Sequence, residues 1–320
     1  MKETVQDQIA ELKKRLNAVV LAHNYQVDSV QDLADHVGDS LELSRQAART
    51  EADVIVFCGV RFMAETASIL NPGKLVLLPD PQADCPMAQM LGAARLRELK
   101  ALHPDAAVVC YVNSTAEVKA LSDVCCTSAN AAAVVNAVEP GRPIMFVPDR
   151  HLGRYVAEQT GRPLILDRGF CPTHVRIRPE HIAELKRIYP DAEVMVHPEC
   201  TAEVTRMADM VTSTGGMLRH AQQTAARLLI VGTEVGLLYR LRLQNPGKEF
   251  IPATRAAVCP NMKRITPAKV LWALQGLKHE VAVPEELRVP ARAALERMLT
   301  IGAQPTGAGA RSLPETRAAR

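Results

Sequence analysis

A chain of 320 residues exceeds what one compact core usually organises, so its length favours two or three domain-sized units. Hydrophobic residues make up 48% and charged residues 23%, which excludes a disordered, collagen-like or coiled-coil chain. Lysine and arginine number 38 against 35 aspartates and glutamates, and only 3% of residues are aromatic. The basic excess is too small, and aromatics are too few, to predict a nucleic-acid partner.

The N-terminal stretch is polar and amphipathic, and the longest apolar runs fall far short of the roughly 20 residues of a membrane helix. We therefore expect no signal peptide, no membrane partner and a cytoplasmic location. In that reducing compartment the eight cysteines are expected to be core thiols, metal ligands or catalytic thiols instead of disulfides.

An internal repeat organises the chain. The segment LRELKALHPDAAVVCYVNSTAEVKALSD around Leu96 matches IAELKRIYPDAEVMVHPECTAEVTRMAD around Ile182, and IAELKKRLNAVVLAHNYQ near the N-terminus is a more distant copy. The ELK glutamates, Glu11, Glu98 and Glu184, are 87 and 86 residues apart. This period predicts three homologous units, which we place at 1–91, 92–178 and 179–301, the last with closing helices.

In the first unit, short apolar runs alternate with amphipathic stretches. The predicted elements are strands at 18–22, 53–57 and 75–78, and helices at 30–34, 41–48 and 62–70. Such alternation predicts parallel sheets, so each repeat is expected to be a three-layer αβα domain, with the three domains around a pseudo-threefold axis. A further helix is expected at 267–275 and a disordered tail at 302–320.

A Cys-Pro pair recurs near the end of each unit, at Cys85, Cys171 and Cys259, with spacings of 86 and 88 residues. Packing around a pseudo-threefold axis would bring the three thiols together. Three thiolates without a fourth ligand favour an iron–sulfur cluster with one open iron. Three buried thiols are the plainer alternative. A structural zinc site would need a fourth ligand and CxxC pairs, and radical chemistry on S-adenosylmethionine would need three cysteines in one loop.

Polar residues recur where the first strand of each unit ends. They comprise three strand-end residues and the residues two positions later, namely His23, Tyr111 and His197 with Tyr25, Asn113 and Glu199. Because ligands bind at the carboxyl ends of parallel strands, these side chains are candidates for binding and proton transfer. A purely structural role for each is the alternative.

A third recurring set consists of Ser40, Ser128 and Thr214, each 17 residues past its strand-end residue and each expected to cap a helix. Three helix N-termini directed at one axis would form a pocket for carboxylates or a phosphate, while plain capping is the alternative. Met63, Arg150 and Glu234 are weaker candidates. Residues without a repeat partner are expected in the core or at the surface, namely Cys58, Cys110, Cys125, Cys126, Cys200, His36, His103, His181, His220 and His279.

With these residues assembled, the stretch from about Ile9 to Ile301 resembles the quinolinate synthase (NadA) family. The matching strings include LAHNYQ, GDS, FCGVRFMAET, YVNST, CPTH, HPEC, STGGM, GTEVGLLYRL and CPNMK. The resemblance implies a transferase of NAD biosynthesis that condenses iminoaspartate with dihydroxyacetone phosphate to quinolinate and releases phosphate and water.

The resemblance also implies one 4Fe-4S cluster on Cys85, Cys171 and Cys259, with the open iron as a Lewis acid. The implied substrate-binding residues are His23, Ser40, Tyr111, Asn113, Ser128, His197, Glu199 and Thr214. We expect Tyr111, His197 and Glu199 to move protons and His23 and Tyr25 to position the triose, while the resemblance places His174 in the active site.

A candidate transient partner is an L-aspartate oxidase or an aspartate dehydrogenase, either of which would supply the unstable iminoaspartate. Two other functions stay open at this point. One is a different cluster-dependent hydro-lyase that acts on a small hydroxy acid. The other is a non-catalytic triplicated module that binds small anions.

Overall fold

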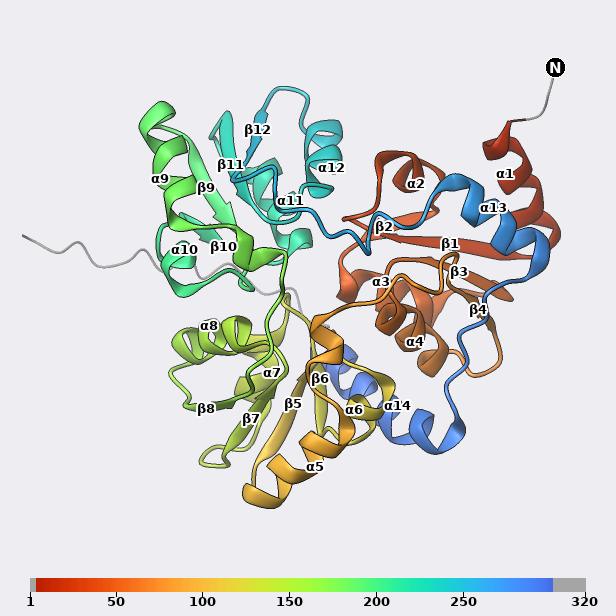
Figure 1. Cartoon of the computed structure of the whole chain (residues 1–320), viewed down its shortest axis with the longest axis horizontal. Coiled ribbons are helices and arrows are strands. Elements are labelled where there is room, and N and C mark those ends of the chain that lie inside the picture. The colour runs from red at the N-terminus through yellow and green to blue at the C-terminus, as the bar shows by residue number, and fades with distance from the viewer. Residues whose placement is uncertain (1–3, 302–320) are drawn as a thin grey trace, which may run out of the picture.

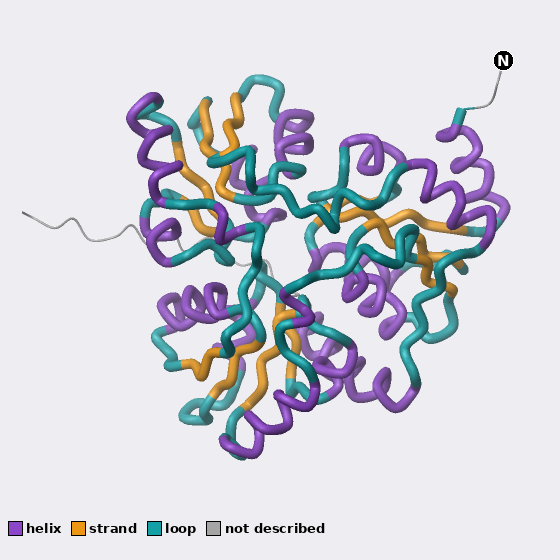
Figure 2. The backbone as a smooth tube through the Cα atoms, in the orientation of Figure 1, coloured by secondary structure: helices purple, strands orange, loops and turns teal. Residues whose placement is uncertain are grey.

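The structure, a computed structural model, describes residues 4–301 and contains three separate parallel sheets of four strands, each flanked by helices (Figure 1). The predicted fold class, three αβα units with parallel sheets, is therefore confirmed. Figure 2 shows the strands in three groups, with loops of all three groups meeting in the middle of the molecule. The predicted tail at 302–320 lies outside the described residues.

The first unit has strand order β2-β1-β3-β4. Its elements are α1 (Val5–Arg15), β1 (Ala18–His23), α2 (Asp28–Leu33), β2 (His36–Gly38), α3 (Ser40–Arg49), β3 (Val54–Cys58), α4 (Arg61–Leu70) and β4 (Leu75–Leu77). All predicted strands and helices of this unit are present. The sequence analysis missed β2, because its three residues are too short for an apolar run to stand out.

The second and third units repeat this order, as β6-β5-β7-β8 and β10-β9-β11-β12. Before and within the second unit lie η1 (Met87–Gln89), α5 (Ala93–Leu102), β5 (Ala107–Tyr111), α6 (Ala116–Ala120), β6 (Val124–Cys126), α7 (Ala131–Ala137), β7 (Ile144–Val147), α8 (Arg150–Thr160) and β8 (Leu164–Leu166). The second unit ends with η2 (His174–Arg176). The third contains α9 (Pro179–Ile188), β9 (Glu193–Val196), α10 (Ala202–Arg206), β10 (Met210–Val211), α11 (Thr214–Gln223), β11 (Leu228–Gly232), α12 (Leu237–Gln244) and β12 (Glu249–Pro252).

Two closing helices return to the earlier units (Figure 1). Helix α13 (Pro267–Gly276), which the sequence predicted, packs against α1 of the first unit. Helix α14 (Glu285–Ile301) packs against α4 of the first unit and against α6 and β6 of the second. The domain limits given above stay a prediction. Within residues 4–301, no helix has the length and apolar character needed to cross a membrane.

Ser40 and Thr214 begin helices as expected, but Ser40, Ser128 and Thr214 are not the N-cap residues that the sequence analysis predicted. Asp39, and not Ser40, is the N-cap of α3, since its carboxylate accepts the N–H groups of Leu41 and Glu42. Ser213 caps α11, so Thr214 is the first helical residue, and Ser128 lies three residues before α7. The repeat locates these positions in each unit, but adjacent residues that can both cap leave the start of the helix undetermined.

Candidate active site

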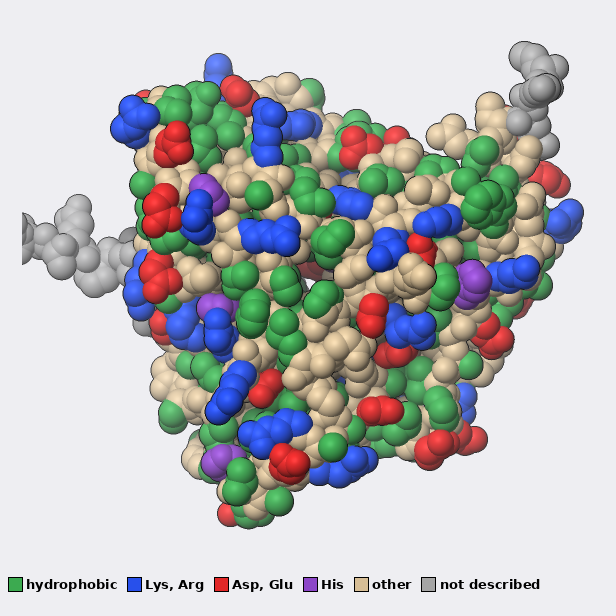
Figure 3. All heavy atoms as spheres, in the orientation of Figure 1, with side chains coloured by type: hydrophobic (Ala, Val, Ile, Leu, Met, Phe, Trp, Pro, Cys, Tyr) green, Lys and Arg blue, Asp and Glu red, His purple; other side chains and the backbone are tan. Residues whose placement is uncertain are grey.

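A pocket of about 620 Å³, part of it open to solvent, lies at the junction of the three units. All of the site residues predicted from the sequence line it: His23, Tyr25, Ser40, Cys85, Tyr111, Asn113, Ser128, Cys171, His174, His197, Glu199, Thr214 and Cys259. Figure 3 shows acidic and basic side chains scattered over one face of the molecule, with hydrophobic side chains around its middle. The polar groups of the site come from all three units, so they are buried together in one pocket only because the units pack against one another.

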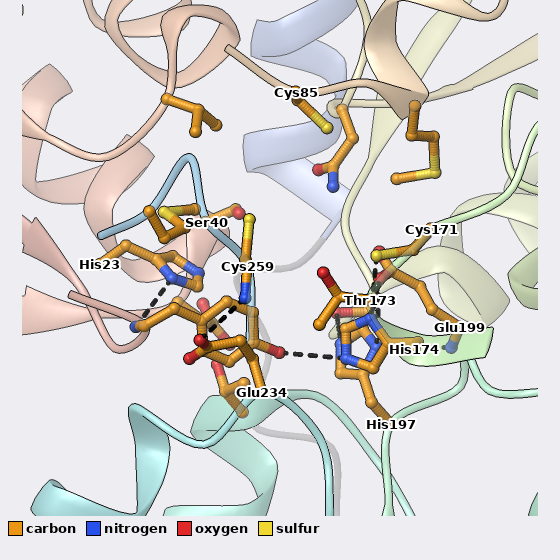
Figure 4. A pocket seen from close by; sticks show the side chains of 18 of the residues that line it. His23, Ser40, Cys85, Cys171, Thr173, His174, His197, Glu199, Glu234 and Cys259 are labelled. Carbon is orange, nitrogen blue, oxygen red and sulfur yellow. Dashed lines mark hydrogen bonds and ion pairs between the residues drawn. The ribbon is translucent and has the colours of Figure 1, made fainter. Parts of the chain in front are cut away.

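The three Cys-Pro cysteines approach the pocket from three different loops (Figure 4). Burial raises the pKa of the Cys85 thiol to about 12 and raises the pKa values of Cys171 and Cys259 as well. Hydrogen bonds from backbone N–H groups two or three residues later oppose this rise in pKa; the donors are Met87 and Ala88, His174, and Asn261 and Met262. Proline has no N–H, so the donors nearest to each sulfur come from the turn that follows it.

These loops fit a thiolate-bound iron–sulfur cluster. Three soft sulfur donors converge, and each has N–H donors of its own chain that stabilise a negative sulfur. Without a bound cluster, the three thiols keep their protons, because burial raises their pKa values. A second donor group, Cys171, His174 and Glu199, has ligand atoms within 4.8 Å of one another, but it is hydrogen-bonded internally.

The two strand-end histidines are buried and share one arrangement. In each, Nδ1 accepts the backbone N–H two residues later, from Tyr25 at 3.1 Å and from Glu199 at 3.3 Å. Burial lowers the pKa of His23 and of His197 to about 3, so both rings are neutral and carry their proton on Nε2. His197 directs Nε2 at the hydroxyl of Ser128, 3.1 Å away.

Glu199 is the centre of the polar network. Tyr111 donates its hydroxyl to Oε1 at 2.6 Å, and Nδ1 of His174 lies 2.7 Å from Oε2. Burial acts to raise the pKa of Glu199, but His174, His197 and the hydrogen bonds from His174 and Tyr111 outweigh it and hold the pKa below its usual range. Burial and the adjacent carboxylate raise the pKa of Tyr111, which keeps its proton. The pair is therefore a carboxylate acceptor and a phenol donor.

A threonine that the sequence analysis missed extends this network. Thr233 follows β11 and places Oγ1 2.6 Å from the hydroxyl of Tyr25 and 2.9 Å from Nε2 of His174. The resulting chain of contacts, from Tyr25 through Thr233, His174 and Glu199 to Tyr111, crosses all three units. Thr233 has no counterpart of the same type in the other two repeats, so the repeat did not select it, although it lies within the matching string GTEVGLLYRL.

Two buried carboxylates hold the loops of the cysteines. Glu234 accepts the N–H of Cys259 at 3.1 Å through Oε1 and forms an ion pair with Lys263, whose Nζ also donates to the carbonyl of Tyr25. Asp149 caps α8, and the N–H of Cys171 is close enough to act on its pKa, which burial raises. Glu234 was a weaker candidate from the sequence, whereas Asp149 was missed.

Ser40, Ser128 and Thr214, the three recurring hydroxyl residues, also line the pocket. Ser40 and Thr214 begin α3 and α11, and the caps of these helices touch, since Ser213 donates to Asp39 at 3.1 Å. Thr214 also accepts from Asn24 at 3.1 Å. Asn113 has a buried Oδ1 with no partner among the described residues, so this acceptor is available to a ligand in the pocket.

The weaker candidates and the residues without a repeat partner divide into those that line the pocket and those that lie outside it. Met63 and Glu234 line the pocket, whereas Arg150 lies on α8 outside the lining, with its guanidinium over the ring of Phe170. The cysteines without a repeat partner are all buried outside the lining: Cys58, Cys110, Cys125, Cys126 and Cys200. Of the six other histidines, His220 pairs with Glu193 and none lines the pocket.

Three α/β units with parallel sheets enclose one pocket with three thiols, two neutral histidines and a carboxylate, which are the features of an enzyme active site. The model of the family described as quinolinate synthetase A protein matches residues 7–300. The chain belongs to this quinolinate synthase family.

Named relatives match over nearly their whole length. The quinolinate synthase of Dehalococcoides mccartyi strain CBDB1 is 56% identical over 300 residues, which cover 94% of this chain and 99% of the relative. The quinolinate synthase of Geobacter metallireducens is 53% identical over 299 residues, which cover 93% of this chain and 98% of that relative. That of Thermodesulfovibrio yellowstonii is 52% identical over 296 residues, covering 92% and 97%.

Proposed function

We propose that this chain condenses iminoaspartate with dihydroxyacetone phosphate to quinolinate, as a transferase of NAD biosynthesis in the cytoplasm. The reaction balances when one phosphate and two water molecules leave for each quinolinate formed. One carbon–carbon and one carbon–nitrogen bond close the ring, and the losses of water require protons to be taken from carbon and given to oxygen. The observation that carries the proposal is one pocket that combines three thiols with proton donors and acceptors from all three units.

Cys85, Cys171 and Cys259 would hold one 4Fe-4S cluster. Bound there, the cluster supplies an iron without a protein ligand, which as a Lewis acid polarises a hydroxyl that leaves as water. The N–H donors of the three turns stabilise the thiolates, and Glu234 holds the backbone of Cys259 in place.

The substrates bring two carboxylates and a phosphate. Ser40 and Thr214 offer hydroxyls at the first residues of α3 and α11, where helix N–H groups also favour negative charge. Ser128 offers a third hydroxyl, held by His197. The unpartnered Oδ1 of Asn113 would accept the N–H of iminoaspartate.

Proton transfer falls to the Glu199 network. Glu199 is a buried carboxylate whose lowered pKa keeps it ionised, so it can accept a proton from substrate when Tyr111 or His174 moves aside. His197 carries a proton on Nε2 and can donate a hydrogen bond to a developing negative oxygen. His23 and Tyr25, on the opposite side of His174, would position the triose.

The proposal is tested by anaerobic reconstitution with iron and sulfide, followed by both substrates. A brown protein with about four irons is expected, with the colour lost in Cys171→Ala and kept in the control Cys58→Ala, a buried cysteine outside the pocket. Quinolinate and phosphate should appear in equal amounts. A colourless wild-type protein would exclude the cluster, and a brown protein that forms neither product would favour a hydro-lyase acting on a different substrate.

A coupled experiment tests the candidate partner. If an L-aspartate oxidase or an aspartate dehydrogenase passes iminoaspartate directly, quinolinate should form at the same rate when a scavenger of free iminoaspartate is added. A rate that falls in proportion to the scavenger would show that the intermediate arrives through solution.

A further inference from the structure

Two buried side chains occupy equivalent places where one unit meets the next. Gln31 on α2 and Lys119 on α6 are 88 residues apart, the spacing that also separates the strand-end residues His23 and Tyr111. Gln31 is 2% exposed and Lys119 is 0% exposed, and both lie outside the pocket lining. Because such polar side chains are rarely buried so fully, the hydrogen bonds that they make indicate what they do.

Lys119 joins the second unit to the first. Its Nζ donates to the carbonyl oxygen of Ser114 at 2.7 Å, in the loop of its own unit that carries Asn113. It also donates to the carbonyl oxygen of Phe62 at 3.3 Å, in the first turn of α4. Phe62 and Asn113 both line the pocket, so one buried nitrogen connects two parts of the pocket wall that come from different units.

Gln31 joins the first unit to the third in the same way. Its Nε2 donates to the carbonyl oxygens of Asn24 at 3.2 Å and Gln26 at 2.9 Å, on either side of the pocket residue Tyr25. A third bond, of 3.2 Å, reaches the carbonyl oxygen of Gly236, directly before α12. Only the NH2 of an amide can donate, so these carbonyl acceptors define which way the side chain points.

The equivalent position of the third unit carries Thr205, 86 residues after Lys119. Its hydroxyl donates to the carbonyl oxygen of Ala202 in its own helix and accepts from Arg154 of the second unit at 3.0 Å. The loop of this unit carries Glu199, which is held by direct bonds of its own side chain to the second unit. A buried nitrogen donor is therefore found under the other two pocket loops.

We propose that Lys119 and Gln31 are positioning residues, each of which fixes the pocket loop of its own unit against the neighbouring unit. Lys119 has the larger effect on substrate binding, because Oδ1 of Asn113 has no partner among the described residues and depends on the backbone that Lys119 holds. Tyr25 is held a second time, through Thr233. The kinetic part of this inference rests on the proposed function, in which Asn113 accepts the N–H of iminoaspartate.

Lys119→Met removes the donor, and Lys119→Gln supplies the amide that the equivalent position of the first unit uses. The control is Lys100→Met, which removes a 2.7 Å bond to the carbonyl oxygen of Leu121 in the same unit, outside the pocket. In the reconstituted enzyme, KM for iminoaspartate should rise about tenfold in Lys119→Met and about threefold in Lys119→Gln, with kcat within about threefold of wild type. The control should keep the wild-type KM, and an unchanged KM in Lys119→Met would overturn the proposal.

A double-mutant cycle separates positioning from a general loss of stability. In the Asn113→Ala background, adding Lys119→Met should change kcat/KM less than about twofold, because the group that Lys119 positions is already gone. Equal losses of kcat/KM in the two backgrounds would show that Lys119 does not act through Asn113.

Hydrogen exchange of the backbone amides, measured on the full chain without its cluster, does not depend on turnover. In Lys119→Met, residues 112–116 and 62–66 should exchange about tenfold faster, whereas Gln31→Met should accelerate residues 24–27 and 236–240 instead. Faster exchange throughout the chain, or wild-type rates at both junctions, would refute the positioning roles. Absence of quinolinate from the wild type would overturn the proposed function alone, and the exchange rates would still decide on Lys119 and Gln31.

Discussion

Acidification should destabilise this fold through two histidines of the pocket. His23 and His197 are 5% and 4% exposed, and burial lowers the pKa of each to about 3. Glu199 opposes the shift, while His174 reinforces it in both cases and Lys263 reinforces it for His23. In the unfolded chain both rings recover a pKa of about 6.5.

The direction of this pH dependence of stability follows from proton binding. Between about pH 3 and pH 6.5 the unfolded chain binds protons that the folded chain excludes, so stability is complete above pH 6.5 and falls as the pH drops below it. From pH 7.5 to pH 5.5 each histidine should cost about 1.4 kcal/mol, and the pair about 3 kcal/mol. Glu199 contributes little in this interval, because an unfolded glutamate titrates near pH 4.3.

Urea unfolding of the cluster-free protein at the two pH values measures this loss. His23→Gln and His197→Gln should each lose about 1.4 kcal/mol less than wild type on acidification, and the exposed His103→Gln should behave as wild type. If both pocket variants lose as much stability as wild type, the buried neutral histidines are not the cause and the reasoning is wrong.

Three further predictions concern single residues. Glu199→Gln should keep the cluster while kcat falls about 10²-fold to 10⁴-fold, because the carboxylate that accepts protons is lost; near-normal turnover would remove it from that role. Glu234→Gln weakens the hold on Cys259, so a chelator should remove iron about tenfold faster, and an unchanged rate would contradict this. Lys119→Met leaves the buried carbonyl of Ser114 without its Lys119 donor, while that of Phe62 keeps Thr66, and should lower the unfolding free energy by about 1–3 kcal/mol in urea titrations; an unchanged unfolding free energy would count against it.

The sequence repeat was enough to predict much of the architecture. A shift of 86 to 88 residues aligned the Cys-Pro pairs and the strand-end residues, and three sheets with one strand order are its structural counterpart. Periodicity located the long strands and helices because apolar spacing reflects which face is buried. It could not find β2, whose three residues bury only Gly38.

The contacts between units were decided by the tertiary structure alone. The bridge from Tyr25 through Thr233 to His174 joins residues from three units, and no local pattern specifies which unlike side chains will meet across such a junction. The pKa values of His23 and Glu199 likewise depend on burial, which arises only when the units pack.

By itself, then, the sequence determined three α/β units, three recurring cysteines and a set of polar strand ends, because equivalent positions in a repeat occupy equivalent places. Packing of the units determined that these groups share one pocket and that the closing helices return to the first two units. The physical reason is that the local sequence pattern indicates which face of a helix or strand is buried. Which side chains of other elements contact that face depends on the packing of the whole core.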